Sequence, residues 1–230
     1  MEAGVVFLAV AAIFVLVCVL VLAVRHSIRA ERARKATLWH WATAQGWTFA
    51  ESGRAPWTAC LPGRNSRGLG VMVSGQFGGR WVAVAEYSYQ TTSSSDFSTT
   101  RTRTTTTSTT TTHRFVVVLV RLDRVYPPVA VVPRGLLSQL GRAMFGDKPT
   151  ATGNALFDSR YRIVAADPAC AKALIGPALI DAHIARTVPH WNIVGADLLT
   201  WIPVSSVLRD PSTIPGYVAP LLHVAELLGR

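Results

Sequence analysis

The chain has 230 residues, which on the usual length scale corresponds to one globular domain with an accessory segment. Half of its residues are hydrophobic, 16% are charged against about 25% in ordinary soluble proteins, and the mean hydropathy is +0.30. These values exclude a wholly disordered chain and argue against a wholly soluble one. Three cysteines are too few for a small protein stabilised by disulfides.

The start of the chain carries the strongest signal. Residues 4–24 are uniformly apolar or small and carry no charge. As an α-helix this stretch would be about 31 Å long, which matches a hydrocarbon core of about 30 Å. The alternative is a cleaved signal peptide, which has basic residues before a shorter apolar core. Here Glu2 is the one charge before the stretch, so the sequence predicts an uncleaved transmembrane anchor over residues 1–24.

The segment after the anchor is basic. Residues 25–35 carry five basic side chains against Glu31 alone, and no basic residue precedes the anchor. The positive-inside rule then predicts a single-pass plasma-membrane protein with its N-terminus outside and its C-terminal domain in the cytoplasm. A basic side chain near anionic headgroups contributes about 1 kcal/mol to binding, although these charges could serve only to fix the topology. The expected partners are the lipid bilayer and its anionic headgroups, and the expected contact residues are Arg25, Arg29, Arg32, Arg34 and Lys35.

Residues 25–46 are predicted to form a basic juxtamembrane helix that continues the anchor, because Pro and Gly are missing up to Gly46 and glycine commonly follows a helix end. Its last turns carry Leu38, Trp41 and Ala42 at helical spacing. This apolar patch is predicted to seat the helix on the domain, the alternative being that the tryptophans lie in the membrane interface.

Residues 47–230 are predicted to form an α+β domain with a mainly antiparallel sheet, since the sequence shows no repeated alternation of strand and helix patterns. Gly78-Gly79 predicts one hairpin turn, Gly195-Ala196-Asp197 predicts a second, and Pro127-Pro128 is expected to end a strand. The expected strands are residues 47–49, 69–77, 80–89, 115–122, 129–132, 161–165, 191–194 and 198–202. The expected helices are residues 135–145, 167–175, 177–186 and 214–228.

Residues 91–112 are a low-complexity segment of Ser and Thr, interrupted by Asp96, Phe97, Arg101 and Arg103. Such a segment buries too little apolar surface to offset the entropy of ordering it, so a mobile loop is expected. Because Thr favours extended structure, the alternative is that its ends prolong the flanking strands as a hairpin arm. A further hypothesis is modification of the hydroxyls by phosphorylation or O-glycosylation, with the two arginines as partners for a phosphate.

The reactive side chains show no recognisable catalytic pattern. Cys60 and Cys170 have no Cys-x-x-Cys spacing or nearby histidine, so free thiols are expected unless the domain is exported. His113 is expected at a strand edge or surface and His223 in a half-buried position on the last helix. The glycine and serine spacings fit neither a nucleophile elbow nor a phosphate-binding loop. We therefore expect no catalytic, cofactor-binding or metal site and no cofactor.

The basic charge of +10 and seven tryptophans raise the possibility of nucleic-acid binding. A binding strand would interleave basic and aromatic side chains on one face. In residues 80–89 the aromatic side chains instead share a face with Ala83 and Ala85, which is typical of a sheet core. Nucleic acid is therefore not an expected partner.

Several short motifs resemble those of a family of single-pass membrane proteins from high-GC Gram-positive bacteria, a domain of unknown function. The resemblance covers about residues 39–202. It is carried by Trp41-Ala42-x3-Gly46-Trp47, Tyr87-Ser88-Tyr89, His113-Arg114-Phe115, Phe157-Asp158-x2-Tyr161-Arg162 with Asp167-Pro168, and Trp191-x-Ile193-x-Gly195-x-Asp197-Leu198-Leu199. It implies an anchored domain and supplies no catalytic residues.

The leading functional hypothesis is a non-enzymatic interaction or scaffolding domain with a protein partner, held at the inner face of the membrane. Whether the protein is an enzyme stays open at this point, because a tethered enzyme can assemble its site from residues distant in sequence. An envelope-facing domain is a third possibility. A pocket with converging reactive side chains would favour the enzyme, and an exposed apolar patch rimmed by arginine would favour the interaction module.

Overall fold

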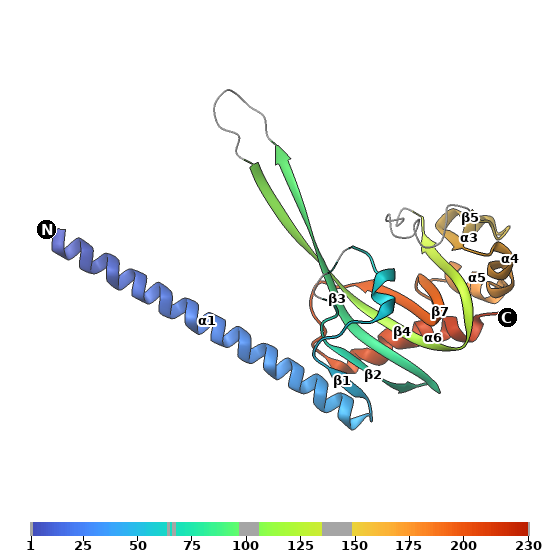
Figure 1. The fold of residues 1–230 in the computed structure, drawn as a ribbon, viewed down its shortest axis with the longest axis horizontal. Coiled ribbons are helices and arrows are strands. Elements are labelled where there is room, and N and C mark those ends of the chain that lie inside the picture. Colours follow the sequence, from blue (N-terminus) through green and yellow to red (C-terminus); the bar gives the residue numbers. More distant parts are fainter. Residues whose placement is uncertain (1, 64, 66–67, 97–105, 135–148, 230) are drawn as a thin grey trace.

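The computed structural model describes residues 2–63, 65, 68–96, 106–134 and 149–229. Helix α1 (Glu2–Ala44) is one uninterrupted rod that projects from a compact domain (Figure 1). The domain consists of a seven-stranded antiparallel sheet and several short helices, which confirms the predicted α+β class. Helix α1 ends two residues before Gly46, which has a positive φ of 68°, as expected for glycine after a helix.

The sheet is built around one very long strand. Its strands are β1 (Thr48–Ala50), β2 (Met72–Phe77), β3 (Arg80–Asp96), β4 (Thr106–Pro133), β5 (Pro149–Thr150), β6 (Tyr161–Ala165) and β7 (Trp191–Pro203). Their order is β1-β2-β3-β4-β6-β5, and β7 also pairs with β4. One edge of β4 therefore pairs first with β3 and then with β6, while the other edge pairs with β7.

Both faces of the sheet are buried, because alternate side chains enter two different clusters. On one face Val82 and Val84 pack with α1, with α6 (Ile214–Leu227) and with α3 (Ala155–Arg160), α4 (Pro168–Leu174) and α5 (Pro177–Ile184). On the other face Ala83 and Ala85 pack under the loop that contains the 3₁₀ helix η1 (Pro56–Cys60). A second 3₁₀ helix, η2 (Pro211–Thr213), leads into α6. This alternation is the period-two pattern of a buried strand.

Most of the predicted elements are confirmed. The Gly78-Gly79 turn joins β2 to β3, and both glycines have positive φ. Helix α4 begins at Pro168 after Asp167, whose carboxylate accepts hydrogen bonds from the backbone N–H groups of Ala169 and Cys170. The predicted helix over residues 135–145 lies outside the described residues.

Two predictions about strand ends are wrong. Pro127-Pro128 does not end a strand, because β4 continues to Pro133 through a register shift at that point. The prolines lie where β3 pairing has stopped and β6 pairing has not begun, so their missing N–H groups remove few ladder bonds. The predicted second hairpin is instead the single strand β7, in which Gly195 lies at the same irregularity opposite Tyr126.

The Ser/Thr segment is not simply a loop. Strand β3 continues to Asp96 and β4 begins at Thr106, so most of residues 91–112 prolong the flanking strands. The expected mobile loop is therefore wrong for residues 91–96 and 106–112, and the alternative of a hairpin arm is confirmed there. Cross-strand pairing and the high β propensity of Thr extend the ladder beyond the hydrophobic core.

Candidate functional site

Helix α1 has two different halves. Among the described residues, one helix is long and apolar enough to cross a membrane, with a mean hydropathy of 2.1, and no residue of its most apolar segment is buried. From residue 13 to residue 24 the large apolar side chains are exposed, for example Phe14 at 70% and Leu22 at 65%. In contrast, Leu38 and Ala42 near its end are fully buried in the core, as predicted. An exposed apolar surface of this extent is typical of a segment that contacts a membrane or another protein, so this half of α1 is a candidate membrane anchor.

Arg34 is the centre of the contact between α1 and the domain. Its Nη1 donates to Glu86 Oε1 on β3 and to the carbonyl oxygen of Leu208, both at 2.7 Å. The backbone N–H of Leu208 donates to the same Glu86 oxygen at 2.8 Å. Three segments far apart in sequence therefore meet at one carboxylate. We call Arg34, Glu86 and Leu208 the junction.

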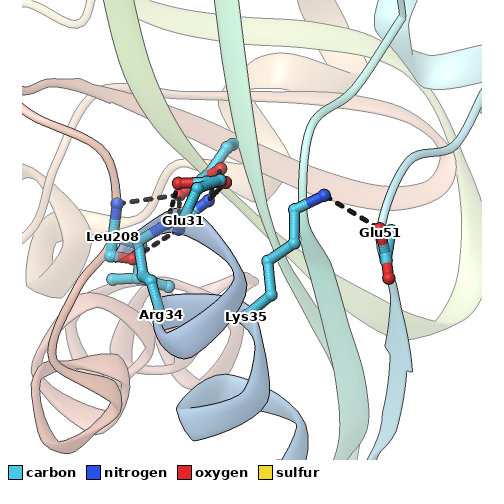
Figure 2. Close-up of polar contacts among 6 residues, drawn as sticks. Glu31, Arg34, Lys35, Glu51 and Leu208 are labelled. Atoms are coloured by element: carbon cyan, nitrogen blue, oxygen red, sulfur yellow. Dashed lines mark hydrogen bonds and ion pairs between the residues drawn. The ribbon is translucent and has the colours of Figure 1, made fainter. Parts of the chain in front are cut away.

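Two carboxylates surround the Arg34 guanidinium. Arg34 also donates two hydrogen bonds to Glu31, one turn earlier on α1 (Figure 2). The hydrogen bond with Glu31 raises the pKa of the Arg34 guanidinium, and the charge of Glu86 acts in the same direction against the effect of burial. The Arg34 and Glu86 side chains are only 9% and 14% exposed, so the ion pair is largely shielded from water. Gly70 leaves room for it, because a Cβ there would lie 3.2 Å from Glu86 Oε2.

Lys35 makes a second link between α1 and the sheet. Its Nζ lies 2.8 Å from Glu51 Oε2, just after β1, and Figure 2 shows the two side chains reaching toward each other. The pair is more exposed than the junction, with Glu51 at 67%. It bridges an open groove of about 850 Å³ between α1 and β1, lined by Ser27, Ile28, Glu31, Arg32, Lys35, Ala36, Trp39, Phe49 and Glu51.

The five residues expected to contact lipid headgroups fall into two groups. Arg25, Arg29 and Arg32 are exposed on α1, within about 12 Å of the end of the apolar stretch. Arg34 and Lys35 are instead paired with carboxylates of the domain and of α1. Lipid contact therefore stays a prediction for the first group. The structure gives the second group a different role, in holding the domain to the helix.

Glu86 is the residue of the junction that sequence reasoning missed. The sequence places it on the same strand face as the buried Val82 and Val84, where it is the carboxylate and Arg80, at the start of the strand, is the other charged side chain. A lone carboxylate on a buried face needs a cationic partner. That requirement was the available signal, but the partner is 52 residues away and could not be identified from spacing.

A small pocket of about 90 Å³ lies beside the junction. It is lined by Gly70, Glu86, Tyr87, Ser88, Arg114, Phe115, Val116, Val204, Ser206, Val207 and Leu208. The Glu86 carboxylate is already engaged by Arg34 and by the Leu208 N–H. The pocket is therefore a small cleft next to an ion pair. Among its lining residues, no free nucleophile lies beside a free base, which a catalytic site would need.

The histidines of the domain differ in how deeply they are buried. His183 is fully buried and its Nε2 accepts a hydrogen bond from Trp191 Nε1 at 3.0 Å. Burial lowers the pKa of both His183 and His190 to about 4, with the charge of His190 adding to the effect at His183. His113 stacks on Tyr89 at a centroid distance of 4.8 Å in the exposed part of β4. His223 on α6 has 47% of its side chain accessible, so it is partly buried, in line with the expectation.

The cysteines lie far apart from one another in the sequence. Cys18, Cys60 and Cys170 are free thiols, and burial raises the pKa of Cys60. Among the described residues, no group of three or more His, Cys, Asp or Glu side chains is arranged to hold a metal ion. Tyr87 lies on β3, the strand with several aromatic side chains. It is buried, and its hydroxyl donates a hydrogen bond to the Pro62 carbonyl oxygen. Its face belongs to the sheet core, as predicted.

Comparison with known proteins yields a fold relationship. No family model matches the chain, and no curated protein matches it. The structure is similar to the crystal structure of the mycobacterial trehalose monomycolate transport factor A, TtfA, with a TM-score of 0.53 and 11% sequence identity. The match covers 85% of this chain and 94% of that chain. At this identity the similarity shows a shared fold alone, and the family resemblance over residues 39–202 stays a prediction.

Proposed function

We propose that this protein is a single-pass membrane-anchored interaction or scaffolding protein whose domain lies at the inner face of the plasma membrane. The observation that carries the proposal is the continuity of α1, which runs without a break from an exposed apolar half to a buried end in the domain core. A hydrophobic helix bare on all sides is stable in lipid and not in water. No flexible linker separates the two halves of α1.

The junction supports a scaffolding role because it fixes the domain relative to the anchor. Arg34 lies ten residues after Val24, which is about 15 Å along a helix. The contacts of Arg34 with Glu86 and Leu208, and of Lys35 with Glu51, hold the domain at that distance from the apolar segment. A tether of this kind presents one side of a domain to the membrane, whereas a flexible linker would leave the domain free to rotate.

The charge distribution supports the orientation. Arg25, Arg29 and Arg32 are exposed directly after the apolar segment, where they would meet the headgroups of the cytoplasmic leaflet. Treating intact cells with proteinase tests this part of the proposal. A tag at the C-terminus is expected to survive, whereas digestion of the tag in sealed cells would place the domain outside and overturn the orientation.

The name of the structural neighbour is compatible with the proposal. That protein of shared fold is called a transport factor, and we extend to this chain the idea of a factor that takes part in transport. Exposed Trp39, which lines the groove between α1 and β1, offers an apolar contact for a protein partner close to the bilayer.

Photo-crosslinking in native membranes tests the interaction. A photoreactive amino acid is placed at Trp39, and in a matched control at exposed Val125 on β4. The proposal predicts a discrete adduct with one membrane protein at Trp39 that is missing at Val125. Equal adduct patterns at the two positions, or none at Trp39, would contradict a specific partner at this groove.

A further inference from the structure

The Ser/Thr segment forms an arm that leaves the sheet. Pairing of β2 with β3 ends at Ala85, and pairing of β7 with β4 ends at Phe115. The ladder between β3 and β4 nevertheless continues from Gln90↔Thr112 to Asp96↔Thr106. We call residues 90–96 and 106–112 the arm. Within the described chain no third strand pairs with it, so both of its outer edges are open.

The chemistry of the arm is almost entirely that of hydroxyl groups. Twelve of its fourteen residues are Ser or Thr, and the others are Gln90 and Asp96. The described side chains at 91–93 and 108–111 are exposed. Its cross-strand contacts are polar, for example Thr92 Oγ1 to Thr110 Oγ1 at 3.5 Å. An isolated two-stranded ribbon of this kind is only marginally stable in water.

The junction relates the arm to the anchor. From Arg34, α1 rises ten residues to Val24, or about 15 Å. From Glu86, which Arg34 contacts at 2.7 Å, β3 rises ten residues to Asp96, or about 33 Å. Figure 1 shows the arm and the N-terminal half of α1 projecting to the same side of the domain. Even a strand inclined by about 60° to α1 would gain about 16 Å along it, enough to reach Val24 at the domain-side end of the apolar segment.

The bilayer limits where such an arm can lie. Its open edges expose backbone N–H and C=O groups that hydrocarbon cannot satisfy. The headgroup layer can satisfy them. Its phosphate and glycerol oxygens accept hydrogen bonds from N–H and hydroxyl groups, and its water molecules both donate and accept hydrogen bonds. We propose that the arm lies in the headgroup layer of the leaflet from which α1 emerges on the domain side, binding polar headgroups through hydrogen bonds. This inference rests on the proposal that α1 spans the membrane.

Hydroxyl recognition differs from the electrostatic contact expected of the arginines. Attraction between basic side chains and lipid depends on anionic headgroups and weakens with salt. Hydrogen bonds from Ser and Thr can be made equally to zwitterionic and anionic phosphodiesters. The position of the arm is therefore expected to be the same in neutral and acidic membranes.

Site-directed spin labelling of the full chain in nanodiscs tests the inference. Nitroxides are placed one at a time at Thr110 in the arm, at Arg29 as a headgroup reference, at Val125 on the same strand as a distant control, and at Leu20 in the apolar segment. Cys18 and Cys170 are replaced by Ser, while Cys60 is kept because it is buried. The discs contain phosphatidylcholine, alone or mixed with phosphatidylglycerol, and a trace of nickel-chelating lipid.

The headgroup nickel is expected to increase the relaxation rate at Thr110 as it does at Arg29, in both lipid mixtures, and to leave Val125 nearly unchanged. A Thr110 label that behaves like Val125 would overturn the inference. So would a Thr110 label with dipolar broadening between molecules and no nickel effect, since the arm would then pair with a second copy. The Leu20 label separates the two proposals: a label accessible to oxygen and shielded from water keeps the anchor intact even if the arm fails, whereas a water-exposed label refutes the anchor.

Discussion

Arg34 and Glu86 are 52 residues apart in the chain, yet their side chains meet at 2.7 Å where α1 lies against β3. Both are mostly shielded from solvent, and Glu86 also accepts the N–H of Leu208. The membrane-proximal helix is thus tied to the middle of the sheet and to the C-terminal third of the chain by one carboxylate. Variants of this carboxylate are the natural test of how firmly anchor and domain are joined.

Replacing Glu86→Gln is expected to destabilise the domain. The substitution leaves Arg34 with Glu31 as its one charged partner in a shielded position, and loss of a partner from a buried pair costs about 3–5 kcal/mol when no other partner exists. Because Glu31 remains, we expect a loss of about 1–3 kcal/mol in the free energy of unfolding, measured by denaturant titration in nanodiscs. The control is Glu51→Gln, whose exposed pair with Lys35 contributes less than about 1 kcal/mol. If the two variants lost the same free energy of unfolding, the junction would contribute no more to stability than an exposed ion pair.

The substitution Gly75→Ala is expected to disturb the packing of the Trp47 side chain near the end of α1. A Cβ at this position in β2 would lie 2.4 Å from Cγ and Cδ1 of the Trp47 ring, closer than atoms can pack. Trp47 also packs edge-on against Trp41, so the end of α1 would shift with it. We expect a loss of about 1–3 kcal/mol in unfolding free energy, together with a change in tryptophan fluorescence.

The matched control for Gly75→Ala is Gly216→Ala in α6. No atom lies within 4 Å of a Cβ there, and alanine favours a helix over glycine by up to about 1 kcal/mol. The control is therefore expected to be neutral or stabilising. If both variants destabilise the domain equally, the contact between Gly75 and Trp47 is not the cause.

The sequence predicts the fold better than it predicts the junction. The apolar N-terminal helix, the α+β class, the Gly78-Gly79 hairpin and the buried patch of Leu38 and Ala42 follow from local sequence patterns, because each depends on neighbours within a few residues. The ion pair of Arg34 with Glu86 depends on tertiary packing, which one sequence does not specify. Arg34 was consequently expected to face lipid.

The two errors in strand length have a common origin. Pro127-Pro128 and Gly195 are local signals for breaks, and both lie at the irregular part of the β4–β7 ladder, where Gly195 is opposite Tyr126. There the strands are held by long pairing on either side, so tertiary structure overrides the local preference and leaves a bulge. The Ser/Thr arm was likewise underestimated, because its order depends on a partner strand rather than on burial.

Acidification is expected to destabilise the domain through His183 and His190. Their pKa values are about 4 in the folded state against a usual value near 6.5, so only the unfolded state gains protons as the pH falls between those values. The contribution of these histidines to the free energy of unfolding is then fully present well above pH 6.5, and it falls by up to about 1.4 kcal/mol per pH unit for each histidine as the pH drops toward 4. Thermal unfolding of the protein at pH 7.5, 6.0 and about 4.5 measures this loss.

Two variants isolate the histidine contribution. His183→Gln keeps an acceptor for the Trp191 N–H and removes a titrating group, so a shallower dependence of unfolding temperature on pH is expected. His190→Gln removes the other imidazole whose pKa burial lowers to about 4, and a shallower dependence is expected for it as well. A wild-type slope retained in His183→Gln would assign the acid sensitivity to other groups.

Replacing Arg25, Arg29 and Arg32 together with Gln is expected to weaken the preference for one orientation in the membrane. The basic excess after the apolar segment falls from four charges to one, and the positive-inside bias falls with it. A fraction of molecules should then expose a C-terminal tag to proteinase on intact cells. Neutralising Arg124, Arg134 and Arg160 in the domain instead is the control and should leave the tag fully protected.

The central claim is that the first half of α1 lies in lipid, and alkaline carbonate extraction of native membranes tests it most directly. Carbonate strips proteins that are bound to the surface and leaves those with a membrane-spanning helix in the pellet. The account predicts that the full-length chain sediments with the membranes and floats with them in a density gradient. Recovery of the full-length chain in the high-speed supernatant, without detergent, would contradict it.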